Sequence, residues 1–193
     1  MEEKIMGGSP HYFIAILLPE ELQEYFSIWQ SVLREKLPYK QWYNKRDFHI
    51  TLKFLGAVDN DKLQELDKKL QGIKMLNAFH VNVGSIGTFG NPKTPRVLWS
   101  GVEKTDTLSQ LAQIVEEYAV QLGFSKENRA YTPHITLAKK WAGNQVTRYD
   151  EILSEMKNKY TTKEKMLVHE VILFQIHPNR EQKYEIIRRY PLR

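Results

Sequence analysis

The tetrapeptide His-Ile-Thr-Leu occurs twice in this chain, and it limits the possible folds more than any other feature. One copy begins at His49 and the other at His134, 85 positions later (134 − 49). Each copy lies in a run rich in β-branched and apolar residues, which is typical of a strand. Alternate side chains of a strand share a face. Each copy is therefore predicted to bury its Ile and Leu and to present an imidazole beside a hydroxyl on the other face.

The rest of the chain is predicted to mix helices with strands. Apolar residues recur at helical spacing in four segments, which are residues 19–37, 59–73, 105–124, with Gly123 as a C-cap, and 147–159. Strand-like runs lie at residues 11–18, 48–55, 78–89, 95–102, 131–139, 164–176 and 183–192. The last two are predicted to pair with each other, and a loop rich in Gly, Asn and Pro is predicted at residues 87–95. Few of these alternate as βαβ units, so the sequence favours an α+β fold.

Composition narrows the class of protein. The chain has 193 residues and no cysteine, which excludes disulfides, thiolate metal sites and cysteine nucleophiles. Its formal net charge of +5 suits an anionic partner and equally suits a merely soluble surface. We expect a flexible tail over residues 1–10, a single domain over 11–193, no transmembrane helix, a cytoplasmic location and a monomer.

Two histidines on paired faces have a chemical use. An imidazole can take or give a proton near neutral pH, so two of them can serve as base and acid on one substrate. Such a pair suits in-line attack on phosphorus, where the nucleophile loses a proton and the leaving oxygen gains one. The hydroxyls of Thr51 and Thr136 can donate hydrogen bonds to phosphate oxygens as charge develops on them. This chemistry requires no metal and no cofactor. A single His-x-Thr would more often be structural, whereas two identical copies favour a functional pair.

Four segments of the sequence together resemble a known family. They are "HYFIAILLPEEL", "FHITLKFLG", "IGTFGNPKTPRVLWSGV" and "LGFSKENRAYTPHITLAK". In this order they resemble the RNA 2',3'-cyclic phosphodiesterases, also called 2'-5' RNA ligases, of the two-histidine phosphoesterase superfamily. The resemblance runs from about Tyr12 to Lys139 and is looser toward the C-terminus. The family often has a serine after its last central strand, where this chain has Gln175 and Ile176, so the C-terminal part is expected to bind substrate differently.

The resemblance implies a fold and a reaction. It implies two lobes of antiparallel sheet backed by helices, related by an approximate twofold axis, with one His-x-Thr strand from each lobe facing a central cleft. The implied reaction opens a 2',3'-cyclic phosphate at an RNA end to leave a 2'-phosphate, and in reverse it would join ends through a 2'-5' linkage. By resemblance, His134 would be the base and His49 the acid, while Thr51 and Thr136 hold the phosphate.

Five further residues are candidate substrate contacts, each with a structural alternative. Arg129 and Tyr131 precede the second motif, where the family often has a basic and an aromatic residue; Arg129 would hold a phosphate or form a surface ion pair. Lys53 shares the His49 face by alternation and would meet the anion or stay solvated. Lys139 matches a basic position of the family, although strict alternation places Lys140, not Lys139, on the His134 face unless a bulge intervenes. Phe89 would stack on a base or pack in the core.

Other aromatic and histidine residues are assigned to structure. Trp42 and Trp99 are expected to pack, and the remaining histidines, which are His11, His80, His169 and His177, show no metal-ligand spacing. Two alternatives to the proposed reaction stay open. One is cleavage of other 2'-linked nucleotides, such as 2'-5' oligoadenylate or a cyclic ADP-ribose phosphate. The other is a nucleotide- or RNA-binding module without turnover, which intact His and Thr at all four positions argue against.

Overall fold

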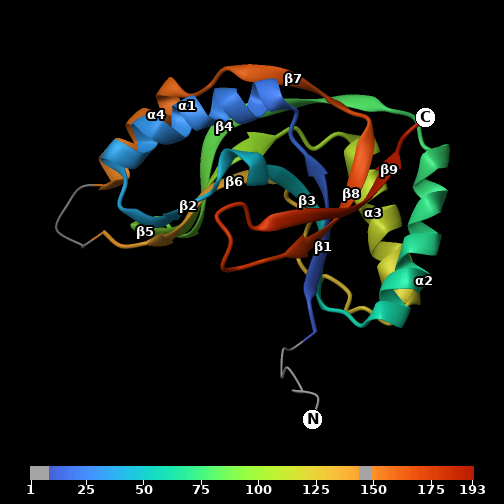
Figure 1. Cartoon of the computed structure of the whole chain (residues 1–193). Coiled ribbons are helices and arrows are strands. Elements are labelled where there is room, and N and C mark those ends of the chain that lie inside the picture. The colour runs from blue at the N-terminus through green and yellow to red at the C-terminus, as the bar shows by residue number, and fades with distance from the viewer. Residues whose placement is uncertain (1–8, 144–148) are drawn as a thin grey trace, which may run out of the picture.

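A computed structural model of the chain describes residues 9–143 and 149–193 as an antiparallel sheet of nine strands with four helices (Figure 1). The strands follow the order β7-β4-β5-β6-β3-β1-β8-β9, and β2 pairs with β6. The strands are β1 (His11–Leu17), β2 (Tyr39–Trp42), β3 (His49–Ala57), β4 (Phe79–Asn91), β5 (Thr94–Val102), β6 (His134–Trp141), β7 (Lys163–Val168), β8 (Glu170–Ile176) and β9 (Tyr184–Pro191). The helices are α1 (Glu20–Lys36), α2 (Asn60–Leu70), α3 (Asp106–Gln121) and α4 (Tyr149–Lys159), with short 3-10 helices at Lys45–Asp47 and Gln71–Met75.

The sheet narrows at its centre, where the two motif strands meet. β3 and β6 are joined through one registered pair, Ile50 opposite Ile135. This pair divides the sheet into a first lobe, made of β3, β1, β8 and β9, and a second lobe, made of β6, β5, β4, β7 and β2. The predicted α+β fold with two lobes of antiparallel sheet is therefore confirmed.

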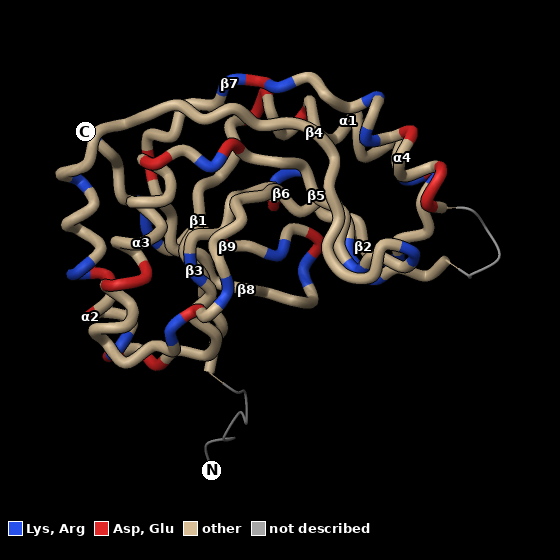
Figure 2. Tube along the Cα trace, turned by 180° about the vertical axis from the view of Figure 1, so that it is seen from behind, with Lys and Arg blue, Asp and Glu red and all other residues tan. Residues whose placement is uncertain are grey.

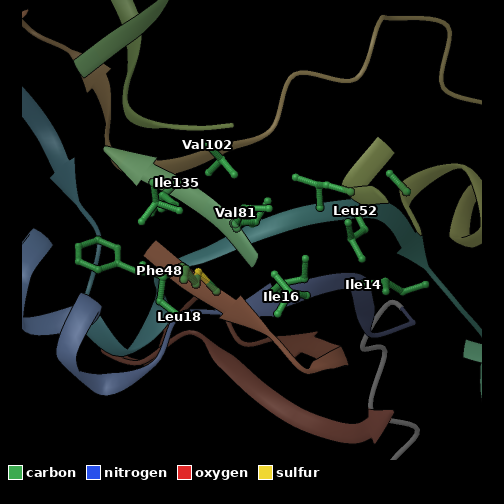
Figure 3. Packing of buried hydrophobic residues seen from close by; sticks show 14 of the residues in the cluster. Ile14, Ile16, Leu18, Phe48, Leu52, Val81, Val102 and Ile135 are labelled. Carbon is green, nitrogen blue, oxygen red and sulfur yellow. The ribbon is translucent and has the colours of Figure 1, made fainter. Parts of the chain in front are cut away.

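The helices cover the lobes in pairs. In Figure 1, α2 and α3 lie against the first lobe, and α1 and α4 lie against the second. Their inward faces join one core with the buried faces of the motif strands, so that Ile14, Phe48, Leu52 and Ile135 pack together (Figure 3). Helix α1 follows the expected spacing, because its buried residues are Leu22, Phe26, Trp29 and Leu33. Helix α3 begins with the Thr105 hydroxyl accepting from Leu108 N and ends before Gly123, whose φ is +78°.

The expected loop at residues 87–95 is wrong. These residues continue β4 and β5 as a hairpin, and the turn is at Pro92 and Lys93. Glycine at position 87 marks close packing, because a Cβ there would lie 2.0 Å from the ring of Trp99. At Gly90, φ is +102°, next to an irregularity in the pairing of the two strands.

The expected strand at residues 164–176 is two strands with different partners. β7 pairs with β4 at the edge of the second lobe, and β8 pairs with β1 in the first lobe, so the chain crosses between lobes at His169. The short strand β2 was not predicted, because four residues with a polar centre carry little periodic signal. The expected hairpin of β8 and β9 is present.

The surface mixes the two signs of charge. Lys and Arg as well as Asp and Glu are distributed over both lobes (Figure 2). Helices α1 and α4 have acidic residues in the first turn and basic residues in the last turn, whereas α3 has no Lys or Arg. In the described part of the chain, none of the helices combines the length and the apolar character needed to cross a membrane. Of the expected tail, residues 1–8 lie outside the described residues, and the carbonyl of Pro10 accepts a hydrogen bond from Val58 N.

Candidate active site

The two motifs bring their polar side chains to one face of the sheet. Ile50 lies opposite Ile135, and both are fully buried on the helix-covered face. In an antiparallel pair, the residue before one member lies across from the residue after the other. His49 therefore lies across from Thr136, and Thr51 lies across from His134, with all four side chains on the face away from the helices. This face carries a square of two imidazoles and two hydroxyls.

Each imidazole is oriented by the backbone two residues before it. His49 Nδ1 lies 2.7 Å from the carbonyl oxygen of Asp47, and His134 Nδ1 lies 2.7 Å from that of Thr132. A carbonyl only accepts, so Nδ1 is the protonated nitrogen in both rings. Nε2 of each neutral ring is then left as the acceptor. His49 Nε2 lies 3.1 Å from Thr51 Oγ1, whose hydroxyl can donate to it. Both histidines are thus prepared to take a proton at Nε2.

Aromatic rings surround His49 and lower its basicity. The ring centroids of Phe13 and Tyr184 lie 4.8 and 5.1 Å from that of His49. The pKa of His49 is lowered to about 4, mainly because the ring is buried. The hydrogen bond to the Asp47 carbonyl opposes this shift, while Lys139 and His134 add to it through electrostatic repulsion. At neutral pH the imidazole of His49 is therefore uncharged before substrate binds.

His134 has a corresponding aromatic setting in the second lobe. The ring centroid of Phe89 lies 4.8 Å away, edge-on, and that of Trp99 lies 6.2 Å away. Burial lowers the pKa of His134, and Lys139 lowers it in addition. Phe89 is thus half-buried against the ring of His134, and Trp99, expected only to pack, also borders the site.

A bulge follows the threonine in both motif strands and exchanges the two faces beyond it. Thr51 pairs with Ala15 but Lys53 pairs with Ile14, which leaves Leu52 as the extra residue. Thr136 pairs with Trp99 but Ala138 pairs with Leu98, which leaves Leu137 extra in β6. Strict alternation therefore fails at the same position of both copies.

The bulge in β6 places Lys139 on the face of the histidines. Its charge acts on both His49 and His134, and its Nζ lies 5.2 Å from the ring centroid of Tyr43. Lys140, which strict alternation assigned to this face, is exposed, with φ at +63°. A cation is thus available beside the paired imidazoles.

The bulge in β3 removes Lys53 from the site, so the expected placement of Lys53 is wrong. Lys53 is only 6% exposed, and its Nζ lies 2.7 Å from Glu116 Oε2 and donates to the carbonyl of Ser125 at 2.6 Å. Phe54, which strict alternation would place on the buried face with Ile50 and Leu52, is instead 59% exposed. The cation serves packing of β3 against α3, and the aromatic ring faces solvent.

The loop before the second motif carries the other two expected contacts. The side chain of Arg129 is 85% exposed and pairs with Glu127 at 3.0 Å, so its guanidinium forms the surface ion pair. Tyr131 is half-buried, and it lines a pocket together with Trp99 and Thr132. Burial raises the pKa of its phenol. Tyr131 therefore shares a pocket with Trp99, whose ring neighbours His134, while Arg129 points outward.

Asp47 and Tyr184 support the site and were not predicted. The carboxylate of Asp47 is buried and accepts from Lys183 N at 2.8 Å and Tyr184 N at 3.3 Å. Its own carbonyl orients His49, so one residue ties the β9 end of the closing hairpin to the first motif. The one sequence signal was the position of Asp47 two residues before the histidine. Tyr184 could not be found, because its contact with His49 joins distant parts of the chain.

The four remaining histidines lie outside this arrangement. His177 Nε2 is 2.8 Å from Glu185 Oε2 at the start of β9, and His11, His80 and His169 belong to other strands or strand ends. Within residues 9–143 and 149–193, no group of three or more His, Cys, Asp or Glu side chains is placed to hold a metal ion.

Comparisons with known proteins show the family of this chain. Residues 10–192 match the family described as AKAP7 2'5' RNA ligase-like domain. The chain is 35% identical over 185 residues to the RNA 2',3'-cyclic phosphodiesterase of Bacillus subtilis (strain 168), which covers 95% of this chain and 97% of that protein. It is 34% identical over 183 residues to the enzyme of the same name from Geobacillus stearothermophilus, covering 94% of this chain and 57% of that longer relative.

Solved structures of related proteins have the same fold. Escherichia coli LigT, crystallised with 3'-AMP, superposes with a TM-score of 0.76 at 25% identity, covering 95% of this chain and 99% of LigT. Protein TT0787 of Thermus thermophilus shares the fold with a TM-score of 0.79 at 21% identity, covering 95% and 98% of the two chains. The chain therefore belongs to the 2'5' RNA ligase-like family of two-histidine phosphoesterases.

Proposed function

We propose that this protein hydrolyses 2',3'-cyclic phosphates at RNA ends, or on nucleotides, to 2'-phosphates. The observation that carries the proposal is the pair of neutral imidazoles, each fixed through Nδ1 with Nε2 left as the acceptor, on one face beside two threonine hydroxyls. The names of its relatives, RNA 2',3'-cyclic phosphodiesterase, support the same substrate class.

Each residue has a role that its surroundings suit. His134 Nε2 takes a proton from water as the water oxygen forms its bond to phosphorus. His49, once protonated, gives its Nε2 proton to the 3' oxygen as the bond from phosphorus to that oxygen breaks. A lowered pKa makes the imidazolium of His49 a strong acid, and the negative charge of an arriving phosphate favours its protonation. The product is a 2'-phosphate beside a free 3'-hydroxyl.

Three further groups face the phosphate in this proposal. The hydroxyls of Thr51 and Thr136 donate to its non-bridging oxygens, whose charge grows as the fifth bond forms. Lys139 supplies a positive charge next to both histidines and stabilises the same oxygens. These residues act without a metal, and the reverse reaction through the same groups would join RNA ends by a 2'-5' linkage.

The test uses an RNA oligomer that ends in a 2',3'-cyclic phosphate, with excess EDTA. We expect the wild type to form an end that resists a 3'-specific phosphatase, and we expect both His49→Ala and His134→Ala to lose this activity. His80→Ala is the matched control, because His80 is exposed on β4 away from the motifs and should keep full activity.

Each contrary result has a distinct meaning. Turnover only without EDTA would refute the metal-independent reaction. Turnover that survives loss of either motif histidine would refute the paired acid and base. Binding of the cyclic phosphate without product would favour the non-catalytic module. A panel that adds 2'-5' oligoadenylate separates the RNA-end reaction from cleavage of other 2'-linked nucleotides.

A further inference from the structure

Lys139 is a cation whose charge acts on both motif histidines. Among the residues that the structure describes, no carboxylate lies within ion-pair distance of its ammonium. A lysine has a flexible stem, so holding its ammonium in one place costs conformational entropy that a contact must offset. The contact that the structure provides is the ring of Tyr43, whose centroid lies 5.2 Å from Lys139 Nζ.

Tyr43 is fixed to the part of β6 that turns Lys139 toward the histidines. Tyr43 N donates to the carbonyl of Leu137 at 3.1 Å, and Leu137 is the extra residue of the β6 bulge. The side-chain amide of Gln30, on α1, donates to the carbonyls of Tyr43 and Leu137, both at 2.9 Å. One amide thus fastens Tyr43 to the bulge. The bulge sets the face of Lys139, and these hydrogen bonds set the place of Tyr43 beside it.

The hydroxyl of Tyr43 reaches the first lobe. Tyr184 Oη donates to Tyr43 Oη at 3.4 Å, and the two ring centroids lie 6.3 Å apart. Tyr184 packs edge-on against His49, with a centroid distance of 5.1 Å. The ring of Tyr43 is therefore restrained from two directions. Its backbone is bound to the second lobe, and its hydroxyl contacts the ring that packs on His49 in the first lobe.

We propose that Tyr43 is a positioning residue, whose ring holds the ammonium of Lys139 where the phosphate binds. The inference rests on the proposed function, in which Lys139 stabilises charge on the phosphate oxygens. The face of an aromatic ring is electron-rich and attracts an ammonium without neutralising it. A carboxylate in the same place would also orient the lysine, but it would cancel the charge of Lys139 and repel the phosphate. The tyrosine ring orients the cation and leaves its full charge for the substrate.

The experiment changes the electron density of the ring and keeps its shape. Kinetics on an RNA oligomer that ends in a 2',3'-cyclic phosphate are compared for wild type, Tyr43→Phe and a variant with pentafluorophenylalanine at position 43. The fluorinated ring is close in size to that of phenylalanine, but its quadrupole has the opposite sign, so its face repels a cation. Tyr43→Phe loses only the 3.4 Å hydroxyl contact, so we expect kcat/KM within about threefold of wild type. The fluorinated variant should be lower than Tyr43→Phe by about 2- to 30-fold.

Lys139→Met is the reference for these losses. If Tyr43 acts through Lys139, the fluorinated ring should lower kcat/KM no further once Lys139 is replaced by methionine. The charge of Lys139 lowers the pKa of His134, so Lys139→Met and the fluorinated ring should both move the acidic limb of the kcat/KM profile to higher pH. The same two substitutions at Tyr25, a half-buried ring on α1 that packs on Trp29, are the matched controls and should change neither readout.

Three results would overturn the inference: equal kcat/KM for the fluorinated variant and Tyr43→Phe, a loss that persists in full in the Lys139→Met background, or an acidic limb that stays in place. If the wild type shows no turnover, the proposed function fails, and calorimetry with inorganic phosphate then decides on Tyr43. Phosphate affinity at least about twofold lower with the fluorinated ring than in Tyr43→Phe, without such a difference at Tyr25, would support the positioning role. Equal affinity of the two variants at position 43, or no phosphate binding by the wild type, would refute it.

Discussion

Lys53 gives a quantitative test of how β3 is fixed against α3. Its ammonium is 6% exposed and lies 2.7 Å from the carboxylate of Glu116, which is 21% exposed. Lys53→Met removes the cation and leaves that carboxylate without its ion-pair partner. Losing one member of a buried pair costs about 3–5 kcal/mol. Glu116 keeps a hydrogen bond from Glu127 N at 2.8 Å and some contact with water. We therefore expect the free energy of unfolding to fall by about 2–3 kcal/mol.

The assay is urea denaturation at pH 7 with a double-mutant cycle. Lys68→Met, an exposed lysine on α2, is the matched control and should change the stability by less than about 0.5 kcal/mol. The double variant Lys53→Met/Glu116→Leu replaces both charges by apolar side chains of similar size, so it should lose less stability than Lys53→Met alone. The reasoning is refuted if Lys53→Met is no more destabilising than Lys68→Met. It is also refuted if the losses of the two single variants simply add in the double variant.

Three further predictions concern the site and its supports. The pKa of His49 is about 4 in the folded protein and near 6.5 in the unfolded chain, so between these values the unfolded chain binds more protons. The free energy of unfolding should therefore fall as the pH drops from 6.5 toward 4. In urea melts at several pH values, His49→Gln should reduce this slope by up to about 1.4 kcal/mol per pH unit. Gly87→Ala would place a Cβ 2.0 Å from the ring of Trp99, so we expect a loss of about 1–3 kcal/mol and an altered tryptophan fluorescence spectrum, and an unchanged thermal midpoint would contradict this packing. Asp47→Asn replaces one of the two carboxylate oxygens that accept backbone N–H groups of the closing hairpin. We expect it to lower the free energy of unfolding by about 1–2 kcal/mol and to lower kcat/KM. Full activity with lower stability would show that the hairpin does not position His49.

The sequence located the centre of the site because local alternation decides it. The side chains of His49 and Thr51 share a face because residues two positions apart in a strand always do, and the same holds for His134 and Thr136. The resemblance supplied the arrangement in two lobes, which the comparisons confirm. What the motif residues do chemically stays a prediction for the assays above.

The residues beyond each threonine could not be placed from sequence alone. The bulges at Leu52 and Leu137 depend on which strands lie beside β3 and β6, and those partners are distant in the chain. Lys53 therefore faced the wrong side in the prediction, while the bulge considered for Lys139 is present. The glycine at 87 was interpreted as a loop residue, because its requirement comes from Trp99 on the neighbouring strand.

The junction of one backbone pair between β3 and β6 has a mechanical consequence. Among the strand pairings that the structure describes, each of the others has three or more registered pairs, so backbone pairing between the lobes is sparsest at Ile50 and Ile135. Each imidazole is held by the backbone carbonyl of the residue two positions before it, Asp47 for His49 and Thr132 for His134. Neither hydrogen bond crosses between the lobes. A small change in the angle between the lobes about this pair would therefore change the distance between the two imidazoles while each ring kept its own hydrogen bond to the backbone.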